Sequence, residues 1–439
     1  MNGLFQQFID LFRQNADAMA QLGVADAPDD FLHALEVDDD GTLRRYRSTI
    51  AEMMKPDYGV NLNGVKSPLM PAAAVRRAVP EFSKDVVNCV NDTYYWKDSI
   101  ANGNVACVLL NSDRAYNSHY HVVSQFNGLF APQTLHIYIK PGTQLSAPLQ
   151  INNILSAAVD LATFRRVKVE VGEGSEVKLV LNESAVDDRH NYLATNFVDV
   201  FVDEGSKVEI YDINATTDNV SRLNEMKVKL KRNCSLDLFS LTLSVGKAVN
   251  IYDIDFESDN SEARLNGFAI GDGIQQIGNS TFVNHLSRHG KSNQNFKYVL
   301  DGNSRGTFYG EIFVWEVARH TEAYQSNKNI LVSRDARMHT EPQLLIYNDD
   351  VKCSHGASTG QLDESALFYM RQRGIPEAVA RTMLTQAFVG DVVDAIGYAP
   401  LRDRIRLLVE NRLYNRSTRP CDNCRMVCNT LTNNENDDN

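Results

Sequence analysis

The chain has 439 residues, of which 43% are hydrophobic and 23% charged, the balance of a folded globular protein. Its formal net charge of -12 argues against nucleic acid and anionic membranes as partners, because both favour basic surfaces. No stretch approaches the roughly 20 apolar residues that a membrane-spanning helix needs. An odd count of seven cysteines favours a reducing compartment over a disulfide framework, so we expect a cytoplasmic protein.

The N-terminal 85 residues carry helical signals. In "MNGLFQQFIDLF" the apolar residues from Leu4 to Phe12 recur at helical spacing with polar residues between them. This pattern predicts an amphipathic helix and not a signal peptide, which would have a basic start and an unbroken apolar stretch. The Pro- and Gly-containing segment from "MMKPDYG" to "SPLMPAAA" favours irregular structure. We therefore predict an N-terminal helical region over residues 1–85.

Residues 86–360 have a different pattern, with short runs such as "RVKVEVGEGSEVKLVL" and "NFVDVFVDEGSKVEIYDI". Alternation of apolar and polar residues with period two predicts strands that have one buried face. Both runs place a Gly-Ser turn before a strand, with Ser175 and Ser206 at positions 31 apart, and "RNCSLDL" places Ser235 another 29 residues on. A loose repeat of this length favours a β-helix over a β-sandwich.

The pattern becomes helical again over residues 361–416. In "LDESALFYMRQRG", Asp363 is a suitable N-cap and Gly374 a suitable stop, and Pro376 begins the next helix. These helices form a predicted C-terminal domain that could either dock a partner or cap the open end of a solenoid. The tail over residues 417–439 is acidic and contains cysteines, and we expect it to be flexible.

The stretch "KCSHGAS" contains the first candidate site. No phosphate-binding loop, HExxH, GxSxG or Rossmann fingerprint occurs in the chain. Cys353 and His355 are two residues apart, so on a strand they share a face. A thiolate and an imidazole are sound ligands for iron or zinc, and a Cys–His pair can also serve as nucleophile and base. A packed cysteine beside a hydrogen-bonded histidine explains the same pattern.

The tail holds a second candidate, Cys421, Cys424 and Cys428, with the spacing C-x2-C-x3-C. Close thiolates suit zinc or an iron–sulfur cluster, but no fourth ligand lies nearby in the sequence, so redox-labile thiols remain an alternative. A histidine pair in "NHLSRHG", His285 and His289, is interpreted as polar residues of a loop because Gly and Ser surround it.

The segment "NKNILVSRDARMHTEPQLLIYNDDVKCSHGASTGQLDESALFYMRQRGI" resembles the C-terminal core of the SufB/SufD family, the scaffold proteins of the Suf iron–sulfur cluster assembly machinery. The likeness is strongest from about Asn327 to Gly397. It implies a right-handed parallel β-helix core flanked by N-terminal and C-terminal α-helical domains. It also implies a scaffold protein that is not itself an enzyme.

Within this family the chain resembles the SufD type. SufB-like members carry a Glu–His–Glu phrase where this chain has Ser354, His355 and Gly356, and a functional cysteine where this chain has Asn327. The resemblance implies that His355 is a ligand for iron or a nascent cluster, with Cys353 a weaker candidate.

The resemblance also implies partners. The expected partners are a SufB-like paralogue, paired through β-helix edges, and a SufC-type ABC ATPase, bound through the C-terminal helices. A SufD-type protein contributes to iron acquisition, and a transient cluster forms at the partner interface. We expect no tightly bound cofactor in the isolated chain, and although a reduced flavin is associated with the assembly, this chain has no flavin motif.

Two alternatives remain open from the sequence. A SufB-like scaffold that accepts persulfide and acts as a homodimer would need Cys353 or the tail cysteines as acceptor. A β-helix carbohydrate-active enzyme would cluster acidic residues along one solenoid face and would usually be secreted. The N-terminal sequence does not have the pattern of a signal peptide, and this and the family resemblance argue against such an enzyme.

Overall fold

The computed structural model describes residues 42–56, 58–60, 82–96, 100–111, 127–128, 130–131, 133–186 and 188–414. Its first elements are the helix α4 (Thr42–Met53) and the short strand β1 (Gly59–Val60). Within the predicted N-terminal helical region, residues 1–85, α4 is the helix that lies in the described part of the chain. The amphipathic segment from Leu4 to Phe12 lies outside the described residues.

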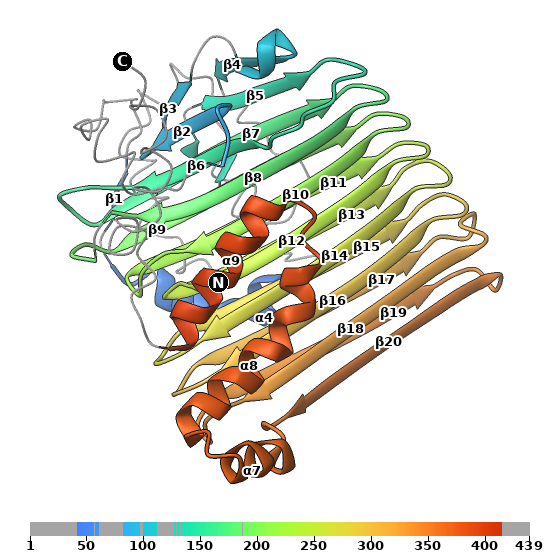
Figure 1. The fold of residues 1–439 in the computed structure, drawn as a ribbon. Coiled ribbons are helices and arrows are strands. Elements are labelled where there is room, and N and C mark those ends of the chain that lie inside the picture. Colours follow the sequence, from blue (N-terminus) through green and yellow to red (C-terminus); the bar gives the residue numbers. More distant parts are fainter. Residues whose placement is uncertain are drawn as a thin grey trace, which may run out of the picture.

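The described strands form two sheets of ten strands each, and from β5 onward consecutive strands alternate between them (Figure 1). The chain therefore winds as a β-helix of about eight turns, which confirms the predicted fold class. The first sheet, here the odd sheet, contains β1, β4 (Val105–Asn111), β5 (Gln133–Ile139), β7 (Leu161–Val171), β9 (Tyr192–Val202), β11 (Val220–Leu230), β13 (Lys247–Phe256), β15 (Gln276–His285), β17 (Arg305–Val314) and β19 (Arg337–Ile346).

The second sheet, here the even sheet, contains β2 (Val86–Val90), β3 (Thr93–Trp96), β6 (Leu149–Leu155), β8 (Glu176–Ala185), β10 (Lys207–Ala215), β12 (Ser235–Ser244), β14 (Glu262–Gly271), β16 (Lys291–Leu300), β18 (Thr321–Leu331) and β20 (Val351–Gly360). A short 3₁₀ helix, η1 (Ile100–Gly103), precedes β4. Two pairs, β2–β3 and β4–β5, are antiparallel, and the other described pairs are parallel.

The interior between the sheets is built from rows of side chains that occupy the same register in successive coils. One such row in the even sheet consists of Leu179, Ile210, Leu238 and Leu265, all fully buried. Burial of apolar area at about 25 cal/mol per Å² is the main stabilising term of such a stack. Each coil buries its inward residues against the coils above and below, as in other solenoids.

The turns between odd and even strands repeat with the predicted Gly-Ser pattern. The backbone N–H of Ser175 donates to Oγ of Ser206 one coil further on, 3.2 Å away. The predicted place of Ser235 in this repeat is wrong by one residue, because Ser235 pairs with Lys207. Cys234 occupies the equivalent position instead, and its buried thiol donates to backbone carbonyls of the neighbouring turns. A small side chain with a weak donor therefore replaces serine there.

Three helices follow the solenoid: α7 (Glu364–Gln372), α8 (Glu377–Asp394) and α9 (Ala399–Leu413). The predicted cap is confirmed, because the carboxylate of Asp363 accepts hydrogen bonds from the backbone N–H groups of the first turn of α7. Gly374 follows α7 with φ of +83°, a conformation that glycine adopts without strain.

The helices α8 and α9 lie along the outer face of the even sheet (Figure 1). Their buried residues, among them Val389 and Ile405, pack against Tyr211, Phe239 and Phe268 of the sheet. The ammonium group of Lys297 adds an ion pair to Asp391 at 2.7 Å and a hydrogen bond to the backbone. The idea that the helices cap the open end of the solenoid is thus wrong for α8 and α9, which cover its side.

His285 ends β15 and is not a loop residue, which corrects the interpretation from its Gly- and Ser-rich surroundings. That composition belongs to the turn that follows, where His289 lies exposed. The ring of His285 is fully buried, stacks on Phe256 with 4.4 Å between centroids, and bonds through Nε2 to Oγ of Ser292 at 2.8 Å. Burial lowers the pKa of His285 to about 3.

This buried imidazole makes stability depend on pH. Because the folded pKa is about 3 and the unfolded pKa about 6.5, the unfolded chain binds the proton first, and stability is lost as pH falls below about 6.5. We expect His285 to account for about 2 kcal/mol of lost unfolding free energy between pH 7 and 5. Urea unfolding at both pH values should show a smaller loss in His285→Gln, but an unchanged loss in the control His289→Gln. Equal losses in all three proteins would contradict this assignment.

Candidate functional site

The last coil of the solenoid has open strand edges. Within the described part of the chain, β20 pairs only with β18 and β19 only with β17 (Figure 1). Most of β20 is exposed, and β19 is at best half-buried. Pro342 stands in β19, and proline is tolerated in edge strands because it lacks a donor for the sheet ladder. The free edges present backbone groups to which a further strand can bind.

Cys353 and His355 lie on β20 and share its inward face. Cys353 is half-buried and packs against Ile312, Val314 and Ala323. Burial raises the pKa of its thiol, so Cys353 is held in the protonated form at neutral pH. His355 is exposed, because no described coil covers this end. The strand thus presents an accessible imidazole beside a packed thiol.

Asn327 occupies an inward position on β18, one coil before this pair. Its amide is buried and has hydrogen-bond partners at both atoms: Nδ2 donates to the carbonyl of Phe296 at 3.2 Å, and Oδ1 accepts from Asn329 and Thr340. An amide in this state holds the coil together and is not a nucleophile. The tail cysteines Cys421, Cys424 and Cys428 lie outside the described residues.

Among the described residues, no group of three or more His, Cys, Asp or Glu side chains is arranged to hold a metal ion. Cys353 and His355 are two candidate donors that β20 places on one face. In the same described ranges, no helix is long and apolar enough to cross a membrane.

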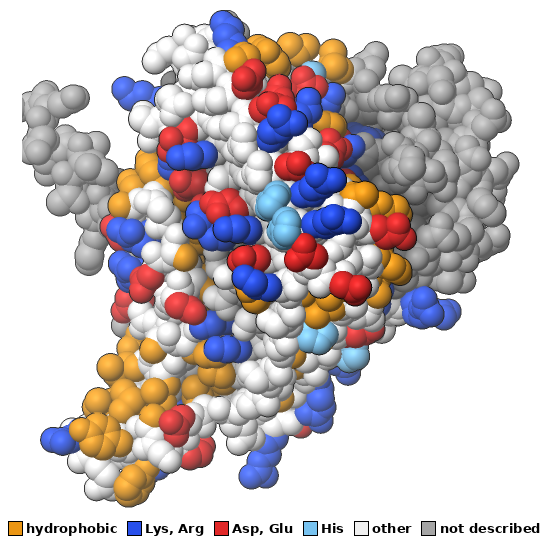
Figure 2. All heavy atoms as spheres, turned by 90° about the vertical axis from the view of Figure 1, so that its right-hand side faces the viewer, with side chains coloured by type: hydrophobic (Ala, Val, Ile, Leu, Met, Phe, Trp, Pro, Cys, Tyr) orange, Lys and Arg blue, Asp and Glu red, His pale blue; other side chains and the backbone are white. Residues whose placement is uncertain are grey.

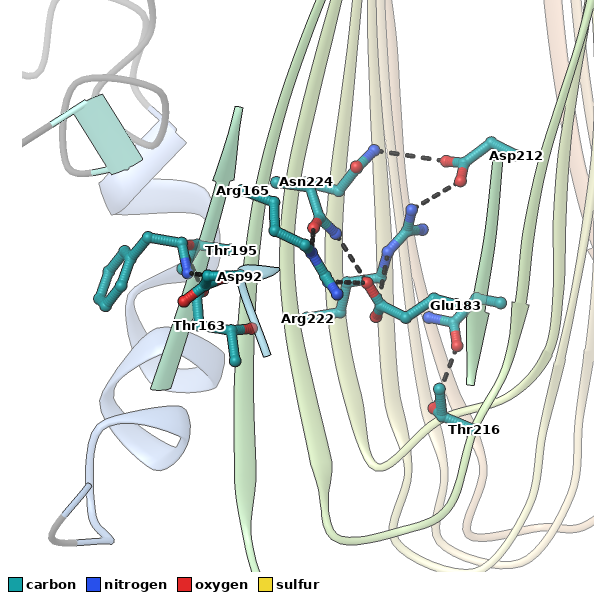
Figure 3. Close-up of polar contacts among 12 residues, drawn as sticks. Asp92, Thr163, Arg165, Glu183, Thr195, Asp212, Thr216, Arg222 and Asn224 are labelled. Carbon is teal, nitrogen blue, oxygen red and sulfur yellow. Dashed lines mark hydrogen bonds and ion pairs between the residues drawn. The ribbon is translucent and has the colours of Figure 1, made fainter. Parts of the chain in front are cut away.

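A buried polar network crosses the interior further from the open end (Figure 3). Arg165 of β7 donates to Glu183 of β8 at 2.6 Å, and Arg222 of β11 donates to Asp212 of β10 at 2.6 Å. All four side chains are at most 4% exposed. Although burial alone would lower the pKa of Arg222, the facing carboxylates raise it above its ordinary value, so the ion pairs persist inside the core.

The members of this network are far apart along the chain, so no local sequence pattern indicates it. Four inward asparagines continue it in register on the odd sheet, namely Asn196, Asn224, Asn250 and Asn279. Asn250 accepts from Arg222 and donates to Asn279, which donates to the hydroxyl of Tyr298 at 2.7 Å. Enclosed and hydrogen-bonded, these groups fix which coil pairs with which, at a cost in desolvation.

The comparison with protein families supports the identification of the chain. Residues 153–388 match the SufBD core domain of the SUF system for FeS cluster assembly, and residues 3–151 match the SufBD protein N-terminal region. The chain belongs to the SufBD family. The core match includes the end of β6, all of β7 to β20, α7 and the first part of α8, and therefore the open strands with Cys353 and His355.

Relatives from other organisms agree with this. The chain is 26% identical over 289 residues to the iron-sulfur cluster assembly protein SufD of Escherichia coli. This alignment covers 64% of this chain and 67% of the relative. It is 41% identical over 124 residues to a SufBD family protein of Synechocystis, 28% and 27% of the two chains. A SufBD family protein of Mycobacterium tuberculosis is 24% identical over 300 residues, 66% of this chain and 74% of the relative.

The packed state of Cys353 predicts low thiol reactivity. At pH 8, alkylation of Cys353 by iodoacetamide should be several-fold slower in the folded chain than in urea, because burial disfavours the thiolate. Mass spectrometry of the peptide containing Cys353 measures both rates. An exposed cysteine on the same strand, introduced as Ser358→Cys, provides the control and should react quickly. Equal rates at positions 353 and 358 would contradict the prediction.

Proposed function

We propose that this chain is the SufD-type subunit of an iron–sulfur cluster assembly scaffold. The observation that carries the proposal is the open end of the solenoid, which places an accessible histidine on an unpaired strand within the family's core domain. The similarity to the SufD protein of Escherichia coli supports the SufD type. Such a scaffold works in the cytoplasm and carries out no catalysis of its own.

The open edges of β19 and β20 would pair with a SufB-like paralogue. Strand addition at a free edge satisfies backbone donors and acceptors on both partners and fixes their alignment. Because a paralogue of the same fold ends in the same kind of strand, the two solenoids can meet end to end. This arrangement would bring β20 next to residues of the partner.

His355 would bind iron or the nascent cluster at this interface. A neutral imidazole is a good ligand for iron, and its exposure allows a metal ion and a partner to reach it. Cys353 is a weaker candidate because its thiol packs into the core. Since this chain supplies one or two donors, the remaining ligands would come from the SufB-like partner, which suits a cluster that must later be released.

The C-terminal helices would dock a SufC-type ABC ATPase. Phe368 and Tyr369 of α7 are 62% and 59% exposed, and Met383 of α8 is 44% exposed. Figure 2 shows hydrophobic side chains gathered at the protruding lower-left end of the molecule, where α7 lies. Exposed aromatic and methionine side chains are typical of protein interfaces. ATP hydrolysis would belong to that partner.

A persulfide-accepting homodimer fits less well. Of its two possible acceptors, Cys353 has a pKa that burial raises, which disfavours the reactive thiolate, and the tail cysteines lie outside the described residues.

The ligand role predicts a specific loss of cluster. When the chain is co-expressed with a SufB-like and a SufC-type protein, His355→Ala should reduce iron and sulfide in the purified complex several-fold, because a first-row metal loses a ligand. The three proteins should still copurify. His339→Ala removes another exposed histidine, on the neighbouring strand β19, and should leave the cluster content unchanged. Normal cluster content in His355→Ala would refute the ligand role.

The docking role predicts a loss of ATPase binding. The double variant Phe368→Ser and Tyr369→Ser should bind the SufC-type protein at least tenfold more weakly in a pull-down or by calorimetry, since aromatic anchors carry much of an interface's affinity. Ile274→Ser, which changes an exposed hydrophobic residue in a turn of the solenoid, is the control and should bind normally. Unchanged affinity of the double variant would exclude this surface.

A further inference from the structure

The row of inward side chains that leads to His355 changes in character along the solenoid. It starts with the aliphatic residues Leu179 to Leu265 on β8 to β14 and continues in register with Gln294 on β16 and Gln325 on β18. His355 is the next residue of this row, directly opposite Gln325. Two buried amides therefore lie between the apolar core and the exposed imidazole.

The amide of Gln325 is buried without a partner. Gln325 is 4% exposed, and neither its Oε1 nor its Nε2 has a hydrogen-bond partner among the described residues. The same is true of Gln294, which is fully buried. Buried polar groups of folded proteins are nearly always hydrogen-bonded, so such a group requires an explanation. The inward Asn327 on the same strand has partners for both amide atoms, so the strand itself does not prevent bonding.

The opposite sheet leaves room for this amide. A Cβ atom at Gly310 of β17 would lie 2.2 Å from Nε2 of Gln325, closer than any real contact. The side chain of Gln325 therefore extends across the interior against the bare backbone of Gly310. Position 310 accepts only glycine if the amide is to stay in this place, one coil beneath His355.

We propose that Gln325 is a positioning residue for His355, an inference that rests on the proposed ligand role of this histidine. When the exposed ring of His355 turns inward over the unpartnered amide, Oε1 of Gln325 accepts the N–H of one ring nitrogen, and the lone pair of the other nitrogen is left directed toward the partner interface. Histidines that bind metals commonly donate their second ring nitrogen to such an acceptor, which fixes the tautomer and the orientation of the ring.

The test reads the imidazole directly in the full-length, metal-free chain. Long-range ¹H–¹⁵N NMR of ¹⁵N-histidine-labelled protein at pH 8 reports the tautomer of each ring. We expect one dominant tautomer for His355 in the wild type and a mixture of both in Gln325→Leu. Gly310→Ala should also give a mixture, because the new methyl group displaces the amide. Gln325→Glu keeps an acceptor and should retain the dominant tautomer.

An internal reference and a second substitution make the result decisive. The exposed His339 of β19 should show the same spectrum in every variant. If Gln325→Leu fails to fold, Gln325→Met preserves the length of the side chain without the amide. An unchanged tautomer of His355 in the folded Leu or Met variant would overturn the inference. Since this readout needs neither metal nor partner, its failure is distinct from a failure of the cluster assay on His355→Ala.

Discussion

Parallel pairing in strict register is the constraint on which the rest of this structure depends. Each strand bonds to the equivalent strands of the coils before and after it, so a side chain at one inward position lies on the same position of its neighbours. A leucine thereby favours another apolar residue above it, and a buried amide or charge requires a polar neighbour. The aliphatic row from Leu179 to Leu265 and the asparagines from Asn196 to Asn279 are the two outcomes of this one rule.

The same constraint explains how a β-helix tolerates arginines and carboxylates in its centre. The ion pairs Arg165–Glu183 and Arg222–Asp212 join the two sheets across the interior. Taking these charges out of water has a desolvation cost that can exceed their mutual attraction, so they are weak evidence for stability. Their benefit is specificity. A slip by one residue would turn each charge outward and leave its partner alone in the core.

Much of the fold could be predicted from local sequence, because alternation, Gly-Ser turns and helix caps are short-range signals. What escaped prediction depends on contacts between distant residues. The predictions for His285 and Ser235 are wrong because a strand boundary and the register of a repeat can shift without a change in local composition. The outer face of the even sheet carries apolar residues because α8 and α9 cover it. The strand pattern alone does not indicate that helices pack there.

The candidate site also has one part that local sequence predicts and another that depends on distant contacts. The shared face of Cys353 and His355 follows from their spacing of two residues. Gln325, by contrast, is 30 positions away from His355 and becomes its neighbour only through the pairing of β18 with β20. Nothing in the sequence around Gln325 indicates that its amide is buried without a partner. That property depends on Gly310 in the opposite sheet, and so on the whole coil.

The two ends of the solenoid differ in the direction in which their strands pair. Beyond β6 and β7 the first end contains the antiparallel pairs β2–β3 and β4–β5, whereas the last end finishes in the parallel strands β19 and β20. If two such molecules join through their last coils, as proposed, the parallel strands β19 and β20 of both are used, and the edges that remain at the other ends are the antiparallel strands β3 and β4. The proposed pairing would cover the open edges of β19 and β20, so that a third molecule could not add at that end.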